Sequence, residues 1–412
     1  MNGVHAENLG ARKAKATRWG TAFLVATAIS VLFLVILVLS IVSQSFGYVL
    51  VISEVDTASL ARNGVALESQ EAPALIETLK EGLTRRHLAT LEEAKPLESR
   101  NREELLSLVM MEIVQERPAR TWTLVQSVFQ RKAIFDFRDS DFPDGRLYFR
   151  SWLRASLLAN PQSSSALDSG LRGAAIGSLA TILLTLLIAF PLGVAAAIWL
   201  EEYAADNAVN RFIQLNIYNL SGVPSIIYGM LGLAVFVRYL EPLTSGVLFG
   251  AAEKGAASGR TILSASLTLA LLVLPVIIIN SQEALRAIPQ SLRKAGLALG
   301  ATKWQTIWHH VLPASADRIL TGTVLAISRA LGETAPLVVV GASTFLTIDP
   351  VSPFSRFTTL PIQIYQWTSR PQGEFKNLAA AAILVLLVLL LTLNATAIIL
   401  RNRFSARRRT NT

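Results

Sequence analysis

Two ionisable side chains inside a long apolar segment are the residues of this chain best suited to chemistry on an anion. The stretch reads Ser-Arg-Ala-Leu-Gly-Glu-Thr and places charges at Arg329 and Glu333. On a helix, residues four apart share one face. Burying a charge in a bilayer costs roughly 3 to more than 10 kcal/mol, so such residues seldom face lipid. The pair is therefore expected to face a water-filled path or a partner subunit.

Arginine is well suited to a tetrahedral oxyanion, because its guanidinium offers fixed, paired donors and stays charged at any working pH. Glu333 is placed to hold Arg329 and to compensate its charge when no anion is present. A purely structural ion pair at a subunit interface remains the alternative. The residues alone leave both interpretations open.

A polar interruption from Asn280 to Asp317 lies between two apolar runs and predicts two short helices. Pro289 suits the first turn of a helix, and Gly300 ends that helix. Its apolar positions recur at helical spacing, with Arg293 and Lys294 on the other side: Leu292, Ala295, Gly296 and Leu299. One face of the second helix, which Leu312-Pro313 is expected to end, carries a second apolar set: Trp304, Ile307, Trp308 and Val311. Such a helix pair either sits in the groove of a partner or lies on lipid headgroups.

Composition requires membrane spans around these features. Of 412 residues, 52% are hydrophobic and only 16% are charged. A span needs about 20 mainly apolar residues. Six segments qualify, the fifth of them carrying Arg329 and Glu333: 20–42, 173–200, 212–237, 261–282, 319–346 and 377–400. The first is too long for a signal-peptide core and is expected to stay as an anchor.

An even number of spans places both termini on one side of the membrane. Residues 1–46 begin with a basic arm and continue into the first span, and residues 401–412 form a basic tail. Basic segments favour the cytoplasmic side, whereas acidic residues such as Glu201 and Glu202 count little in this rule. The loop at 280–317 is then cytoplasmic, and the hydrophilic residues 47–170 lie outside.

The hydrophilic insert is expected to be a small α/β domain. Helices are predicted at 74–87 and at 99–115, with Ser99 as a cap, and short strands at 121–129 and 133–137. Residues 160–170 read as a linker. The chain has no cysteine, and its four histidines supply no catalytic or metal cluster: His5, His87, His309 and His310.

The loop resembles the cytoplasmic EAA loop of ABC-importer permeases, whose pattern is Glu-Ala-Ala, three residues, Gly, nine residues, Ile, one residue, Leu-Pro. The correspondence runs through Lys294-Ala295-Gly296, Gly300, His310 and Leu312-Pro313. In that family the loop docks on the ATP-hydrolysing subunit and carries its motion into the membrane. Lys294 replaces the acid and Gly296 the second alanine, so the family's salt bridge to the ATPase cannot form in the usual way.

Two further motifs narrow the resemblance to the A-type permease subunits of phosphate ABC importers, in a longer form with an extracytoplasmic insert. Residues 224–229 read Pro-Ser-Ile-Ile-Tyr-Gly, which is typical of phosphate-type permeases. Arg329, Gly332, Glu333 and Thr334 fit the pattern Arg-Ala-x-Gly-Glu-Thr, in which that arginine and glutamate are implicated in moving phosphate. The resemblance covers about residues 171 to 400.

The resemblance implies an all-α polytopic protein of the bacterial inner membrane. Six transmembrane helices, five of them in a type I (MetI-like) permease core at 171–400, accompany the α/β insert. No cofactor and no catalytic residue is implied, since ATP is hydrolysed elsewhere and the chain has no G-x-x-x-x-G-K-S/T loop. The implied partners are a second similar permease, two ATP-binding subunits, a periplasmic phosphate-binding protein and membrane lipid, with no nucleic acid.

Three rival functions make different demands on the sequence. A secondary transporter often shows an inverted repeat, and none is visible here. A permease for sulfate or molybdate is expected to keep the loop but to lose the pair at 329 and 333. A sensor or membrane enzyme needs a catalytic cluster.

Overall fold

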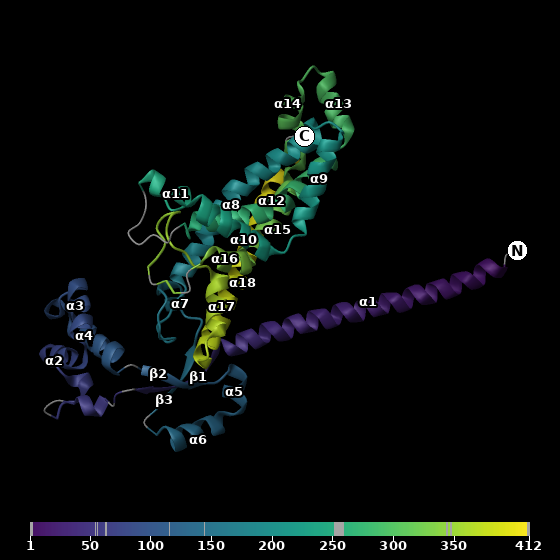
Figure 1. Ribbon diagram of the computed structural model, residues 1–412. Helices are drawn as coiled ribbons and strands as arrows, with labels where there is room; N and C mark the ends of the chain where they lie inside the picture. Colours follow the sequence, from purple (N-terminus) through teal and green to yellow (C-terminus); the bar gives the residue numbers. More distant parts are fainter. Residues whose placement is uncertain are drawn as a thin grey trace. The chain divides into compact units, whose positions relative to one another are not determined.

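The computed structural model describes residues 3–53, 55, 57–61, 64–114, 116–143, 145–250, 259–342, 345–346 and 348–409 (Figure 1). The side chains of His5, of His87 and of the basic tail at 401–412 lie outside the described part. The chain divides into two compact units. The first comprises Met1–Leu153 with Gln372–Ala381, and the second comprises Arg154–Pro371 with Ala382–Thr412.

The first unit joins a long apolar helix to a three-stranded antiparallel sheet. Helix α1 (Gly3–Gln44) leads into β1 (Phe46–Ser53), which lies between β2 (Glu116–Thr121) and β3 (Arg146–Ser151). The buried core beneath the sheet includes β1, where Leu50 is fully buried and packs with Trp122 and Ile134. The helices of this unit's insert are α2 (Ala72–Gly82), α3 (Arg85–Ala94), α4 (Arg102–Val109), α5 (Leu124–Phe129) and α6 (Arg131–Asp141).

The α/β character of the insert is confirmed, but the predicted strands at 121–129 and 133–137 are wrong. Both segments are helical, in α5 and α6. Thr123 explains the first error, because its side chain and that of Gln126 form a reciprocal capping box that starts α5. The helix predicted at 74–87 divides after Gly82. The next predicted helix is capped by Asn101 rather than by Ser99.

The second unit is a helical bundle around one central helix, α12. Helix α12 packs against α8, α9, α10 and α15. The small residues that let the backbones approach include Gly193, where a Cβ would meet Ile277 at 2.6 Å. Ser266 Oγ donates to the Thr181 carbonyl at 3.1 Å, which ties α12 to α8. The unit's helices are α7 (Ala155–Ala159), α8 (Arg172–Ile198), α9 (Ala208–Ser221), α10 (Ser225–Gly232), α11 (Glu241–Thr244), α12 (Ile262–Arg286), α13 (Gln290–Ala298), α14 (Lys303–Thr306), α15 (Leu312–Gly332), α16 (Ala335–Val340), α17 (Leu360–Ser369) and most of α18 (Gly373–Arg409).

Four of the six predicted spans are single helices long and apolar enough to cross a membrane, and two are interrupted. The four are Arg12–Gln44, Arg172–Tyr203, Ile262–Arg286 and Gly373–Ile399. The third predicted span bends by 104° between Ser221 and Ser225, where Pro224 cannot continue a helix. The fifth is not one helix, because α15 ends at Gly332 and α16 begins at Ala335.

Candidate functional site

The predicted charged pair lies where a helix of the bundle ends. Arg329 occupies the last turn of α15, and Glu333 follows the helix in extended conformation (φ −73°, ψ 126°). Arg329 Nε lies 3.4 Å from Glu333 Oε1. The arginine side chain is 58% exposed and the glutamate side chain 17%. Within the described part of the chain this is the one hydrogen bond of the guanidinium, so its two terminal nitrogens remain available as donors.

A second helix interruption lies close to the first, because the helices that begin directly after the two interruptions pack against each other. Helix α10 begins after the break at Pro224 and contacts α16, which begins after the break at Glu333. A Cβ on Gly229 would lie 2.6 Å from Pro336 Cα, so only glycine permits this approach. Tyr228 Oη donates to the Leu220 carbonyl at 2.7 Å across the α9–α10 break. Irregular backbone within a membrane protein persists where protein buries it or where it lines a cavity.

An amide outside the predicted site residues, Asn394, holds the end of α15. Ser328 Oγ donates to Asn394 Oδ1 of α18 at 2.6 Å. Asn394 is the single amide within the apolar run from 378 to 400, and that isolation is the signal that identifies it. The contact fixes the turn that carries Arg329 against a neighbouring helix of the same unit.

The polar loop forms the predicted helix pair at one end of the bundle (Figure 1). Pro289 precedes α13, and Gly300 has φ +83°, a conformation that glycine adopts without strain. Gly296 lies against Thr306 of the second helix, where a Cβ would come within 2.8 Å of the threonine Oγ1. The glycine is therefore needed for the close packing of the two helices.

Leu312-Pro313 does not end the second helix, contrary to the prediction. Helix α14 continues through a π-helical turn (Ile307–Val311) directly into α15. A proline lacks the N–H that an α-helix needs and crowds the preceding turn, and a widened turn directly before it relieves that crowding. The loop and the segment bearing Arg329 therefore belong to one continuous helical rod.

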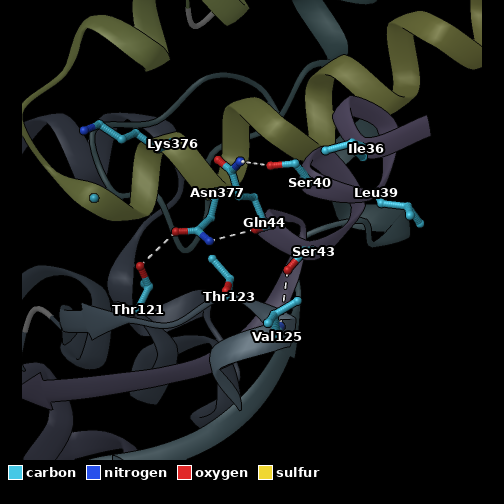
Figure 2. A pocket seen from close by; sticks show the side chains of 11 residues that line it. Ile36, Leu39, Ser40, Ser43, Gln44, Thr121, Thr123, Val125, Lys376 and Asn377 are labelled. Atoms are coloured by element: carbon cyan, nitrogen blue, oxygen red, sulfur yellow. Dashed lines mark hydrogen bonds between the residues drawn. The ribbon is translucent and has the colours of Figure 1, made fainter. Parts of the chain in front are cut away.

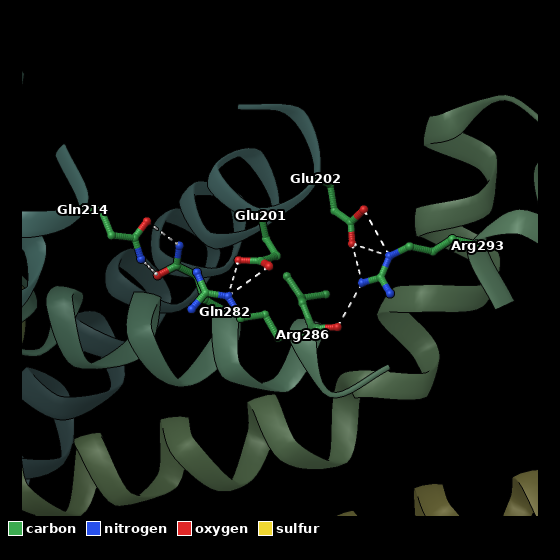
Figure 3. Close-up of polar contacts among 7 residues, drawn as sticks. Glu201, Glu202, Gln214, Gln282, Arg286 and Arg293 are labelled. Carbon is green, nitrogen blue, oxygen red and sulfur yellow. Dashed lines mark hydrogen bonds and ion pairs between the residues drawn. The ribbon is translucent and has the colours of Figure 1, made fainter. Parts of the chain in front are cut away.

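Two arginine–glutamate pairs lie where the loop meets the bundle, and the one formed by Arg293 connects the first loop helix to it (Figure 3). Arg293 Nη2 lies 2.7 Å from Glu202 Oε1, with side chains 13% and 7% exposed. The same guanidinium donates to the carbonyls of Ile288 at 2.8 Å and Leu285 at 2.9 Å. Arg286 Nε lies 2.8 Å from Glu201 Oε2, but the arginine side chain is 51% exposed.

Helical spacing places Arg293 with Lys294 on the polar side of the first loop helix, but Arg293 is largely buried in its ion pair with Glu202. Only Lys294 of that basic pair is exposed. The sequence does carry a signal for these pairs. Glu201 and Glu202 stand next to each other at the end of one apolar run, and Arg286 and Arg293 lie seven residues apart after another.

The four apolar residues predicted on one face of the second loop helix form a buried pair and an exposed pair. Ile307 and Val311 are buried, 1% and 0% exposed, in a cluster that the half-buried Leu292 also joins. Trp304 and Trp308 are 55% and 52% exposed and stack on each other with ring centroids 5.4 Å apart.

The exposed tryptophans adjoin other uncovered apolar residues of the first loop helix. Leu297 is 52% and Leu299 89% exposed, and Ala295 is exposed as well. We name the exposed set formed by Leu297, Leu299, Trp304 and Trp308 the loop patch. Apolar side chains gathered in this way mark an interaction site.

A helical bundle with candidate membrane spans, a charged pair at a helix interruption and a loop that exposes an apolar patch agree with a membrane transport subunit. Residues 189–410 match the family described as the binding-protein-dependent transport system inner membrane component. The match covers more than half of the chain, and the chain belongs to that family. It is thus a membrane-integral permease of the ABC transporter class.

Individual relatives agree with this assignment. The chain is 32% identical over 261 residues to the probable ABC transporter permease protein YqgI of Bacillus subtilis, covering 60% of this chain and 83% of that protein. It is 35% identical over 234 residues to the phosphate transport system permease protein PstA of Yersinia pestis, covering 55% and 71%. It is 33% identical over 241 residues to PstA 1 of Mycobacterium tuberculosis, covering 58% and 72%.

Among solved structures, the inward-facing methionine transporter MetNI is similar at 17% identity with a TM-score of 0.44, covering 57% of this chain and 95% of that chain. A bacterial alginate importer is similar at 15% identity with a TM-score of 0.43, covering 68% and 92%. The family match, the PstA relatives and the mostly helical fold confirm the resemblance found in the sequence. The fold class is likewise confirmed: a polytopic helical permease core with a small sheet-bearing insert.

Proposed function

We propose that this chain is the permease subunit through which a binding-protein-dependent importer moves inorganic phosphate into the cytoplasm. The observation that carries the proposal is the half-exposed Arg329 beside Glu333 at a helix interruption. The similarity to two proteins named phosphate transport permeases supports the choice of anion.

Arg329 binds the anion and Glu333 positions the arginine. Glu333 occupies only Nε of the guanidinium within the described residues, and the terminal nitrogens present paired donors to two phosphate oxygens. When no anion is present, the carboxylate partly offsets the arginine charge, which lowers the cost of holding that charge within the bundle. The anion takes over this role during passage.

Glu333 also gives the path a preference for a protonated oxyanion. At neutral pH phosphate keeps at least one P–OH group, because the last of its three protons leaves only far above neutral pH. A carboxylate accepts a hydrogen bond from such a group but repels a fully ionised oxyanion such as sulfate. The exposure of only 17% of the Glu333 side chain strengthens both effects.

The loop patch is proposed to dock on an ATP-binding subunit, which hydrolyses the ATP. Lys294, Gly296 and Gly300 belong to this coupling loop together with Leu312-Pro313. The continuous rod from Lys303 to Gly332 supports a direct mechanical connection to Arg329. The complete importer adds a second similar permease, a second ATP-binding subunit and a periplasmic phosphate-binding protein.

We also propose that residues 171–400 form the permease in the inner membrane, that both termini are cytoplasmic and that residues 47–170 form a periplasmic insert. Asn377 Nδ2 donates to the Gln44 carbonyl at 2.7 Å, so the end of α1 meets the start of α18 beside β1. If the N-terminal arm and the C-terminal tail lie on one side of the membrane, the end of α1 and the start of α18 lie together on the opposite side. This supports a shared side for the arm at 1–46 and the tail at 401–412.

The test is ATP-driven uptake of radiolabelled phosphate by the whole importer in liposomes, with the binding protein outside. Arg329→Gln is expected to lower uptake about 100-fold or more, the equivalent of two charge-assisted hydrogen bonds. The subunits are expected to co-purify as before. Arg318→Gln, on the exposed side of the same helix, is the control.

Undiminished uptake by Arg329→Gln would remove the pair from the path. Uptake of sulfate or molybdate in preference to phosphate would instead assign the permease to another oxyanion.

A further inference from the structure

A cavity of about 540 Å³ lies within the first unit, where the end of α1 meets the first turn of α18 (Figure 2). Neither the transport path nor the coupling loop involves it. Its volume falls in the range of small-molecule sites, roughly 300 to 1,000 Å³.

Hydrogen bonds between distant parts of the chain hold the walls of this cavity in place. Asn377 donates to the Gln44 carbonyl at 2.7 Å and accepts from Thr121 Oγ1 at 2.8 Å. The Val125 N–H donates to Ser43 Oγ at 3.2 Å, which attaches α5 to the last turn of α1. Figure 2 shows these three bonds around the cavity, which is therefore a built feature of the fold.

The cavity has an apolar part and a polar part, and Lys376 borders it. Ile36 and Leu39 from α1 and Val125 from α5 are 52%, 61% and 54% exposed. Ser40 and Ser43 lie further along α1 and carry hydroxyl groups.

Lys376 at the start of α18 is exposed and makes no ion pair among the described residues. Glu374, the nearest acid on that helix, projects about 200° around the axis from it. Its side chain borders the cavity, its ammonium extends away from Ser40 and Ser43 (Figure 2), and no acid lies beside it on its own side of α18.

The polar part lies at the level where one candidate span ends and another begins. The charge-free run of α1 ends at its last turn, and the candidate span of α18 begins at Gly373. Helix α5, attached at this level, exposes Val128 and Phe129 by 63% and 82%. Apolar residues below a cation at the end of a span match the arrangement of an acyl chain below a phosphate headgroup.

We propose that this cavity binds one phospholipid with an anionic headgroup. The headgroup phosphodiester lies against the Ser40 and Ser43 hydroxyls, the exposed Lys376 side chain turns toward it, and an acyl chain follows Ile36 and Leu39 along α1. Free phosphate shares the headgroup chemistry, but it gains nothing from the apolar wall. The lipid anchors the junction between α1, α18 and the insert, and this role does not depend on which anion the permease transports.

The experiment is native mass spectrometry of the full importer in mild detergent, titrated with phosphatidylglycerol or, separately, phosphatidylcholine. One tight phosphatidylglycerol per chain is expected. Lys376→Gln should weaken its binding about five-fold, and Leu39→Trp, which fills the apolar part from an exposed position, should weaken it at least as much. Lys80→Gln, on the exposed surface of α2, is the matched control and should leave binding unchanged.

Parental binding of phosphatidylglycerol by either cavity variant would overturn the proposal. So would equal binding of phosphatidylcholine, or displacement of the lipid by millimolar inorganic phosphate, which would mark a simple anion site. Loss of lipid from both cavity variants with the control intact would establish the site, because both substitutions lie on exposed positions that the fold does not need.

Discussion

Removing the carboxylate of Glu202 should release the coupling loop from the bundle. Glu202 pairs with Arg293 at 2.7 Å in surroundings that leave the two side chains only 7% and 13% exposed. Breaking a buried pair by removing one partner costs about 3–5 kcal/mol, because the other charge stays buried without compensation. Arg293 keeps its bonds to the Ile288 and Leu285 carbonyls, so the low end, about 3 kcal/mol, applies to Glu202→Gln.

The neighbouring residue provides a control with the same chemistry and a different expected magnitude. Glu201 pairs with Arg286 at a similar distance, 2.8 Å, but Arg286 is 51% exposed. Exposed pairs contribute about 0–1 kcal/mol. Glu201→Gln should therefore change little, although it removes the same group one position away.

Hydrogen exchange of the α13 amides, measured by mass spectrometry on the assembled importer, distinguishes the two variants. A loss of about 3 kcal/mol in local opening free energy corresponds to roughly 100-fold faster exchange in Glu202→Gln. Uptake per ATP hydrolysed should fall together with protection, since a loosened loop transmits less motion. If Glu202→Gln exchanges no faster than Glu201→Gln, the pair does not hold the loop and the reasoning fails.

Three further perturbations test other parts of the structure. Glu333→Gln should reduce the preference of uptake for phosphate over sulfate at least ten-fold, because the repulsion of a fully ionised anion is lost; an unchanged preference in competition assays would exclude the carboxylate from selection. Gly296→Ala should destabilise the loop by about 1–3 kcal/mol through its contact with Thr306, and Thr306→Ala should largely restore the stability, as thermal unfolding would report. Trp304→Ala should leave the unfolding temperature unchanged but weaken co-purification of the ATP-binding subunit about 30-fold, whereas Leu325→Ala on exposed α15 should affect neither; an equal effect of both would contradict docking at the loop patch.

The sequence pattern correctly predicted those features that depend on residues close to one another along the chain. Apolar length identified four spans, and Pro289 and Gly300 bounded α13 as expected. The pairing of Arg329 with Glu333 followed from a spacing of four residues. Strand prediction failed in the insert, because β-prone composition at 121–129 yielded to the helix-starting capping box at Thr123.

The sequence by itself determined that this is a membrane permease, where its loop lies and which charged pair stands in its bundle. Tertiary structure alone decided which arginine of the loop is buried, which apolar residues stay exposed and how α14 continues into α15. The physical reason is distance along the chain: helical periodicity assigns a side chain to a face, but Arg293 finds its carboxylate 91 residues away. Only the packed bundle brings those groups together, and the dry contact between them makes the interaction strong.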